Sequence, residues 1–69
     1  MPEATVQAVQ PYQLHGTLYY QFILLFDGEM RPRDARLSHD MAYPEPAAGD
    51  RVDVHAILGI IDGVQKLPA

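Results

Sequence analysis

The apolar residues of this chain fall in short runs that are separated by glycine or proline. These runs are rich in Val, Ile, Tyr and Phe, and a new run begins about every 10 residues, which is typical of β-strands joined by tight turns. The pattern predicts five strands, at residues 4–14, 18–26, 29–38, 51–58 and 60–67.

Two glycine-containing dipeptides, His15-Gly16 and Asp27-Gly28, are expected to form two-residue hairpin turns. The first turn places Tyr12 opposite Tyr19. The second turn sets a register whose facing pairs are Phe26 and Glu29, Leu25 and Met30, Ile23 and Pro32, and Leu18 and Leu37. Both hairpins share strand 18–26, which is therefore predicted to lie at the centre of three strands.

This central strand is apolar on both of its faces, because side chains alternate along a strand. One face is expected to carry Leu18, Tyr20, Phe22, Leu24 and Phe26, joined by Val9, Ala35 and Leu37. The other face is expected to carry Tyr19, Ile23 and Leu25, joined by Val6, Ala8, Tyr12, Leu14 and Met30. Since a flat three-stranded sheet cannot bury both faces, we expect strong coiling and some residual apolar surface.

The C-terminal third is expected to supply the remaining layer of sheet. Its first strand alternates Val52, Val54, Ala56 and Leu58 with polar residues, which predicts a half-buried strand with a polar outer face. Gly59 suggests a bulge or a sharp bend, and Asp62-Gly63 a further tight turn. The approach to this strand, PAAGDRVDV, resembles strand entries in small barrels of the OB and SH3-like kinds.

The predicted fold is all-β: a small, five-stranded, strongly coiled antiparallel sheet or partly open barrel, OB/SH3-like. Residues 34–42 also fit a short helical turn, with Leu37 and Met41 four residues apart on one face. If that helix formed, the fold would be α+β.

Composition indicates one small acidic binding domain, residues 1–69. Nine acidic against five basic residues give a net charge of −4, which opposes nonspecific binding to nucleic acid. A chain of 69 residues can bury only a thin core, which favours support from a partner protein or from a second copy in a homo-oligomer. The chain has no cysteine, no signal peptide is expected and no apolar run is long enough to cross a bilayer, so we expect a cytoplasmic location away from membranes.

No residue pattern in the chain predicts catalysis. Ser38-His39-Asp40 contains the residue types of a hydrolase triad, but consecutive side chains diverge and cannot form a line of hydrogen bonds. The three histidines, His15, His39 and His55, are too widely spaced to indicate a metal site, and His55 is expected to pair with Asp53 on its own strand. We therefore expect no enzyme activity, no metal and no cofactor.

The sharpest signal is a cluster of three arginines beside the aromatic strand. Arginine next to tyrosine and methionine is typical of protein interfaces, although charges also protect exposed sheet edges, and a cross-strand tyrosine pair stabilises a sheet without any ligand. The sequence favours a non-enzymatic protein-binding module, a small adaptor or regulatory domain that binds another protein or itself. Its predicted contact residues are Tyr12, Tyr19, Ile23, Leu25, Met30, Arg31, Arg33 and Arg36. The alternative is an OB-like single-stranded nucleic-acid-binding protein, in which bases stack on the tyrosines.

Overall fold

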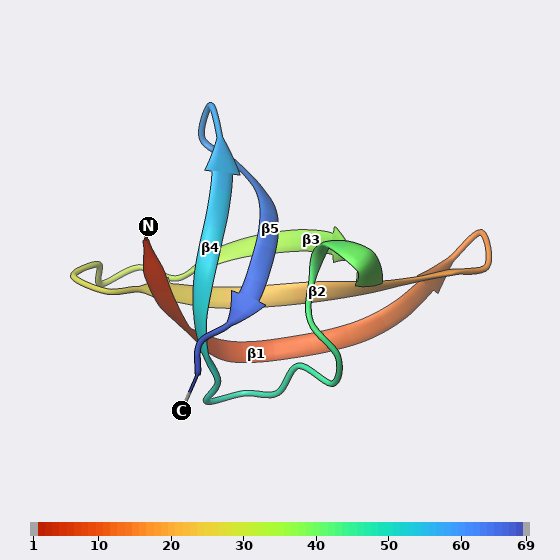
Figure 1. The fold of residues 1–69 in the computed structure, drawn as a ribbon, viewed down its shortest axis with the longest axis horizontal. Helices are drawn as coiled ribbons and strands as arrows, with labels where there is room; N and C mark the ends of the chain where they lie inside the picture. The colour runs from red at the N-terminus through yellow and green to blue at the C-terminus, as the bar shows by residue number, and fades with distance from the viewer. Residues whose placement is uncertain (1, 69) are drawn as a thin grey trace.

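A single antiparallel sheet of five strands forms the protein (Figure 1). The computed structural model describes residues 2–68. The elements are β1 (Glu3–Leu14), β2 (Thr17–Phe26), β3 (Arg33–Ser38), a 3₁₀ turn η1 (His39–Met41), β4 (Arg51–Ile57) and β5 (Ile60–Lys66), and the order in the sheet is β3-β2-β1-β4-β5. In Figure 1, β4 and β5 run steeply across β2 and β3, so the sheet folds over itself.

The predicted all-β fold class is confirmed, including the central place of β2 between β1 and β3. The sheet does not close, because β3 and β5 contact one another without forming a hydrogen-bonded strand pair. The α+β alternative is wrong, since η1 is the only helical element in residues 2–68. It lies near the end of residues 34–42, which the sequence also fits to a short helical turn. Among the described residues there is no helix with the length and apolar character needed to span a membrane.

The first hairpin forms in the predicted register, with Tyr12 opposite Tyr19. Its turn residues, His15 and Gly16, both have positive φ, at 53° and 79°. This is the requirement of a type I′ turn, whose twist matches that of the flanking strands. The β4–β5 hairpin repeats the same geometry at Leu58 and Gly59.

The second predicted hairpin is wrong in its register. A β-turn does form, because the N–H of Glu29 donates to the carbonyl of Phe26 at 3.0 Å, but only Gly28 has a positive φ, at 83°. A turn whose positive φ lies only at its second central residue is of type II, which splays its strands, so pairing begins only at Leu24 and Arg33. Residues 29–32 therefore lie outside β3.

The register of β3 is shifted by two residues from the prediction. Ile23 lies opposite Asp34 instead of Pro32. An even shift keeps every side chain on its predicted face, because side chains alternate. Ala35 and Leu37 are accordingly buried on the core side, as expected.

A β-bulge at Gln7 lets β1 belong to both layers of the folded sheet. Val6 lies opposite Leu24 and Ala8 opposite Ile23, so Gln7 has no facing residue. The extra residue reverses the faces before it, and Val6 is fully buried in the core instead of sharing a face with Tyr19. The first residues of β1 pair with β4, so β1 contributes to both layers.

A second bulge corrects the prediction for the C-terminal hairpin. His55 lies opposite Gly63 and Ala56 opposite Ile61, which leaves Asp62 without a facing residue. Beyond the bulge Ala56 is exposed, and the predicted inward position of Leu58 is wrong. The predicted turn at Asp62-Gly63 is also wrong, because both residues lie within β5.

The core lies between the β1–β2–β3 layer and the β4–β5 hairpin. It consists of Ala4, Val6, Phe22, Leu24, Phe26, Ala35, Leu37, Val52, Val54 and Val64. The inner face of β2 is thus the one that carries Phe22, Leu24 and Phe26, and its other face points outward.

Candidate interaction surfaces

Five of the eight predicted contact residues share the outer face of the β1–β2–β3 layer: Tyr12, Tyr19, Ile23, Leu25 and Arg36. We call this set the outer face. The rings of Tyr12 and Tyr19 stack, with centroids 5.6 Å apart and an interplanar angle of 19°. The four apolar members are already half-buried by their neighbours. A partner would therefore remove only part of their area from water.

The other three predicted residues lie elsewhere. Met30 and Arg31 are exposed in the loop of residues 27–32. Arg33 is on the core side of β3, opposite Leu24, and its guanidinium carbon is 5.0 Å from the centroid of the Phe26 ring. Arg33 also pairs with Glu29, with 2.8 Å between Nη2 and Oε2. Arg33 therefore covers the edge of the core, and the structure does not bring the eight residues together.

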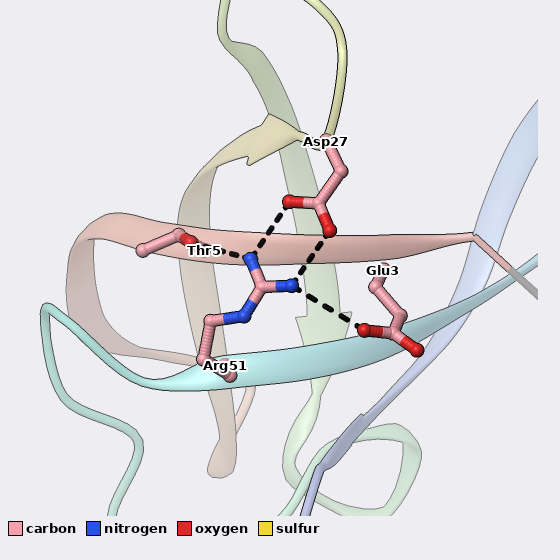
Figure 2. Close-up of polar contacts among 4 residues, drawn as sticks. All are labelled: Glu3, Thr5, Asp27 and Arg51. Carbon is pink, nitrogen blue, oxygen red and sulfur yellow. Dashed lines mark hydrogen bonds and ion pairs between the residues drawn. The ribbon is translucent and has the colours of Figure 1, made fainter.

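Arg51 is a further arginine that pairs with carboxylates of the same chain (Figure 2). Its guanidinium contacts both carboxylate oxygens of Asp27, at 2.7 and 2.6 Å, together with Thr5 Oγ1 at 2.8 Å and Glu3 Oε1 at 3.3 Å. Hydrogen bonding from Arg51 lowers the pKa of Asp27. Figure 2 shows the guanidinium reaching from β4 across β1 to the end of β2, so these contacts join the two layers.

The largest exposed apolar group is one that the sequence prediction missed: the tip of the β4–β5 hairpin, residues Ile57–Ile60. The exposed fractions are 56% for Ile57, 98% for Leu58 and 71% for Ile60. In Figure 1 this hairpin tip projects away from the rest of the sheet. The signal that could have identified it is the Leu-Gly pair inside an unbroken apolar run.

Leucine is an unfavourable residue at position 58 on two counts. Its φ is +52°, in the left-handed region that type I′ turns require and that Asn or Gly adopt most readily. For a residue such as leucine this conformation costs roughly 1–2 kcal/mol. The side chain is almost fully exposed, so no burial within the chain offsets that cost. Neither turn geometry nor packing accounts for Leu58.

A pocket of about 320 Å³ lies between η1 and the β4–β5 hairpin. Its lining includes Asp40, Asp53, His55 and Asp62. His55 Nδ1 is hydrogen-bonded to Asp62, so the predicted pairing of His55 with Asp53 is wrong. One oxygen of Asp53, Oδ1, is buried without a hydrogen-bond partner among the described residues. Across residues 2–68, no group of three or more metal-binding side chains is arranged to hold an ion.

The Ser38-His39-Asp40 segment has a simple local arrangement. The hydroxyl of Ser38 donates directly to the carboxylate of Asp40, and this hydrogen bond lowers the pKa of Asp40. Since His39 does not lie between serine and aspartate, the hydrogen-bond sequence of a triad is not formed.

Comparisons with protein-family models, with curated proteins and with solved structures find no match to this chain. Its function must therefore be argued from its own residues.

Proposed function

We propose that this protein is a non-enzymatic protein-binding module, and that the tip of its β4–β5 hairpin enters an apolar pocket on another protein. The observation that carries the proposal is Leu58, an almost fully exposed leucine at a position with left-handed backbone. A residue that is unfavourable both for the turn and for the free surface is most simply explained by burial in a complex.

The energetics of such a contact are favourable. Fully burying a leucine or isoleucine side chain contributes about 1.5–3 kcal/mol, and side chains that enter pockets at the centre of an interface dominate binding. Ile57 and Ile60 face one another across the turn and fix its shape before the partner arrives. A preformed tip loses little conformational entropy on binding, so more of the burial energy appears as affinity.

The outer face is the second surface that we propose for a partner. Tyr12, Tyr19, Ile23 and Leu25 offer a smaller gain because they already cover one another. Arg36 lies on the same face, and a guanidinium can orient a partner by contacting its carboxylates or carbonyls.

A protein partner is favoured over the alternative of single-stranded nucleic acid. The chain has a net charge of −4, and Arg33 and Arg51 are paired with carboxylates. A nucleic-acid groove would need those charges to face phosphates. Because the chain has no cysteine and suits a reducing compartment, we place this activity in the cytoplasm.

The test is a pull-down from a lysate of the source cell with tagged wild type and with Leu58→Asn, each with and without nuclease. Asparagine keeps the turn and removes the apolar side chain. We expect a protein that wild type captures in both nuclease arms and that Leu58→Asn does not capture. Met30→Ser is the matched control, because Met30 is 96% exposed but lies in a different loop; it should retain the captured protein.

Two outcomes would reject the proposal. Equal capture by wild type and Leu58→Asn would remove the hairpin tip from the interface. Capture that disappears after nuclease treatment would favour the nucleic-acid alternative.

A further inference from the structure

The strand β3 has one free edge, and its backbone groups there can be identified from the alternation of hydrogen bonds in the sheet. The first hairpin closes at Leu14 and Thr17, a facing pair that exchanges its hydrogen bonds in a two-residue hairpin. Odd-numbered residues of β2 therefore bond to β1. The N–H of Asp27, which donates to the carbonyl of Glu3 at 3.0 Å, continues the same alternation.

Even-numbered residues of β2 accordingly bond to β3, where their facing residues are Arg33, Ala35 and Leu37. The N–H and C=O groups of Asp34 and Arg36 then point away from β2, toward the free edge. No other strand among residues 2–68 pairs with this edge. A groove of about 360 Å³ runs along it, lined by residues 33–36 on one side and by residues 59–61 of the β4–β5 hairpin on the other. This edge can therefore accept another strand.

The charges on this edge are arranged so that they can pair with the same charges of a second copy. Asp34 and Arg36 flank Ala35, and both side chains lie on the outer side of the sheet. Neither makes an ion pair among the described residues, and the Asp34 carboxylate accepts only a long hydrogen bond, 3.4 Å, from Gln21. An antiparallel copy of β3 centred on Ala35 would place Asp34 of each chain opposite Arg36 of the other.

We propose that two copies of this chain associate through their β3 edges, antiparallel and centred on Ala35, to form one continuous sheet. In this register Asp34 and Arg36 of the second copy form the hydrogen-bonded pairs, so that their outward N–H and C=O groups are satisfied. The contact is isologous, as expected for a two-fold dimer.

The charge pattern also selects this register over its neighbours. A shift of the register by two residues in one direction places Asp34 opposite Asp34 of the second copy. The same shift in the other direction places Arg36 opposite Arg36. Like charges directly opposite one another destabilise a strand pair. In a register shifted by one residue, the outer sides of the two β3 strands would lie on opposite sides of the joint sheet. That arrangement would bring the core side of one β3 strand into water. If these charges served only to block edge pairing, we would not expect both Asp34 and Arg36 to lie opposite a side chain of opposite charge in one register.

This dimer goes beyond the proposed function and uses different atoms. The dimer contact rests on the backbone and charges of β3 beside residues 59–61 of the hairpin, and Leu58 does not line that groove, whereas partner binding is assigned to the Leu58 side chain. Leu58→Asn should therefore leave self-association unchanged, and failure of one proposal can be distinguished from failure of the other.

The first experiment is sedimentation equilibrium of the purified full chain from about 1 µM to about 1 mM, a range that covers weak to moderate dimers. We compare wild type with Asp34→Arg, with Arg36→Asp and with the double variant that carries both substitutions. Each single substitution places like charges opposite one another and should weaken the dimer about tenfold. The double variant restores two opposite-charge pairs and should recover most of the wild-type affinity. A monomeric wild type throughout this range, or a double variant no better than the single ones, would overturn the proposal.

The second measurement needs no variant and so does not depend on folding of a mutant. Amide hydrogen exchange of wild type is followed at low and at high protein concentration. The amides of Asp34 and Arg36 should become protected as concentration rises, while those of Ala35 and Leu37 should be protected throughout because they bond to β2. Exchange at Asp34 and Arg36 that is fast and independent of concentration would contradict the proposed pairing.

Discussion

The hydroxyl of Tyr43 donates a hydrogen bond to Oδ2 of Asp50, 2.7 Å away. The same carboxylate oxygen accepts the N–H of Ala47 at 3.0 Å, and the carbonyl of Asp50 accepts the N–H of Val6 at 2.9 Å. Asp50 therefore joins the loop between η1 and β4 to the bulged part of β1. This loop, which contains Pro44 and Pro46, has its shape fixed by a few polar contacts.

Removal of the Tyr43 hydroxyl should destabilise the protein. Tyr43→Phe keeps the aromatic packing against the core and leaves the Asp50 carboxylate with one donor fewer, which is expected to cost about 1 kcal/mol. Urea unfolding at neutral pH measures the difference. Tyr12→Phe is the matched control, because Tyr12 stacks on Tyr19 and its hydroxyl makes no side-chain hydrogen bond among residues 2–68; it should unfold like wild type.

The cost of Tyr43→Phe should depend on pH. The hydrogen bond from Tyr43 holds the pKa of Asp50 below its ordinary value, while burial and the bonded carboxylate raise the pKa of Tyr43, so the tyrosine remains a donor at neutral pH. A carboxylate with a lowered pKa in the folded state contributes stability above its unfolded pKa, about 3.9, and loses it as pH falls through the folded value. The difference in the free energy of unfolding between wild type and Tyr43→Phe should thus be constant above about pH 5 and shrink below about pH 4. A difference that is unchanged in acid would show that Asp50 is not the acceptor.

Leu58→Asn should stabilise the isolated protein while it removes partner binding. Asparagine adopts positive φ more readily than leucine, so we expect a gain of about 1 kcal/mol, or roughly 4–8 °C in the thermal midpoint of a domain this small. Leu58→Ala is the control: it removes the apolar side chain but keeps a residue that disfavours positive φ, and it should give no comparable gain. If both variants have the midpoint of wild type, the turn is not strained.

Arg51→Gln should lower the thermal midpoint, because it removes contacts that join β4 to β1 and to the end of β2. The effect should diminish in about 1 M salt, which screens exposed charges. It should also diminish as pH falls through the lowered pKa of Asp27, since a protonated Asp27 no longer pairs with Arg51. Arg31→Gln is the control, because Arg31 is exposed and makes no ion pair among the described residues. Equal midpoints for both variants would mean that Arg51 does not join the layers.

The predictions that succeeded depend on local sequence, and those that failed depend on distant contacts. His15-Gly16 and Asp27-Gly28 are similar dipeptides, yet only the first forms a two-residue hairpin turn. The second differs because Asp27 is held from outside the hairpin: its N–H donates to Glu3 and its carboxylate binds Arg51. Neither contact can be predicted from the dipeptide itself.

The candidate site was predicted only in part for a related reason. Alternation identified the outer face, but it cannot locate a bulge, because one extra residue looks like any other member of a strand. The unpaired residue Asp62 reverses the faces near the tip, and the turn itself falls at Leu58-Gly59, so Leu58, predicted within a half-buried strand, lies instead at the exposed tip. The exposure of Leu58 is the feature that identifies this candidate surface, and it depends on the register of the β4–β5 hairpin.

The bulge at Gln7 also determines where this chain can tolerate a change in length during evolution. At residues 30–32 of the loop, outside the paired strands, one residue gained or lost alters only a connection. A further residue inserted beside Gln7 would reverse the start of β1, so that Ala4 and Val6 would face water and their polar neighbours would face the core. Loss of Gln7 would leave Val6 opposite Leu24 but would remove the bulge that bends β1. Among relatives of this protein, insertions should therefore accumulate in the loop and be rare in β1, where one added residue decides which side of the strand is inside.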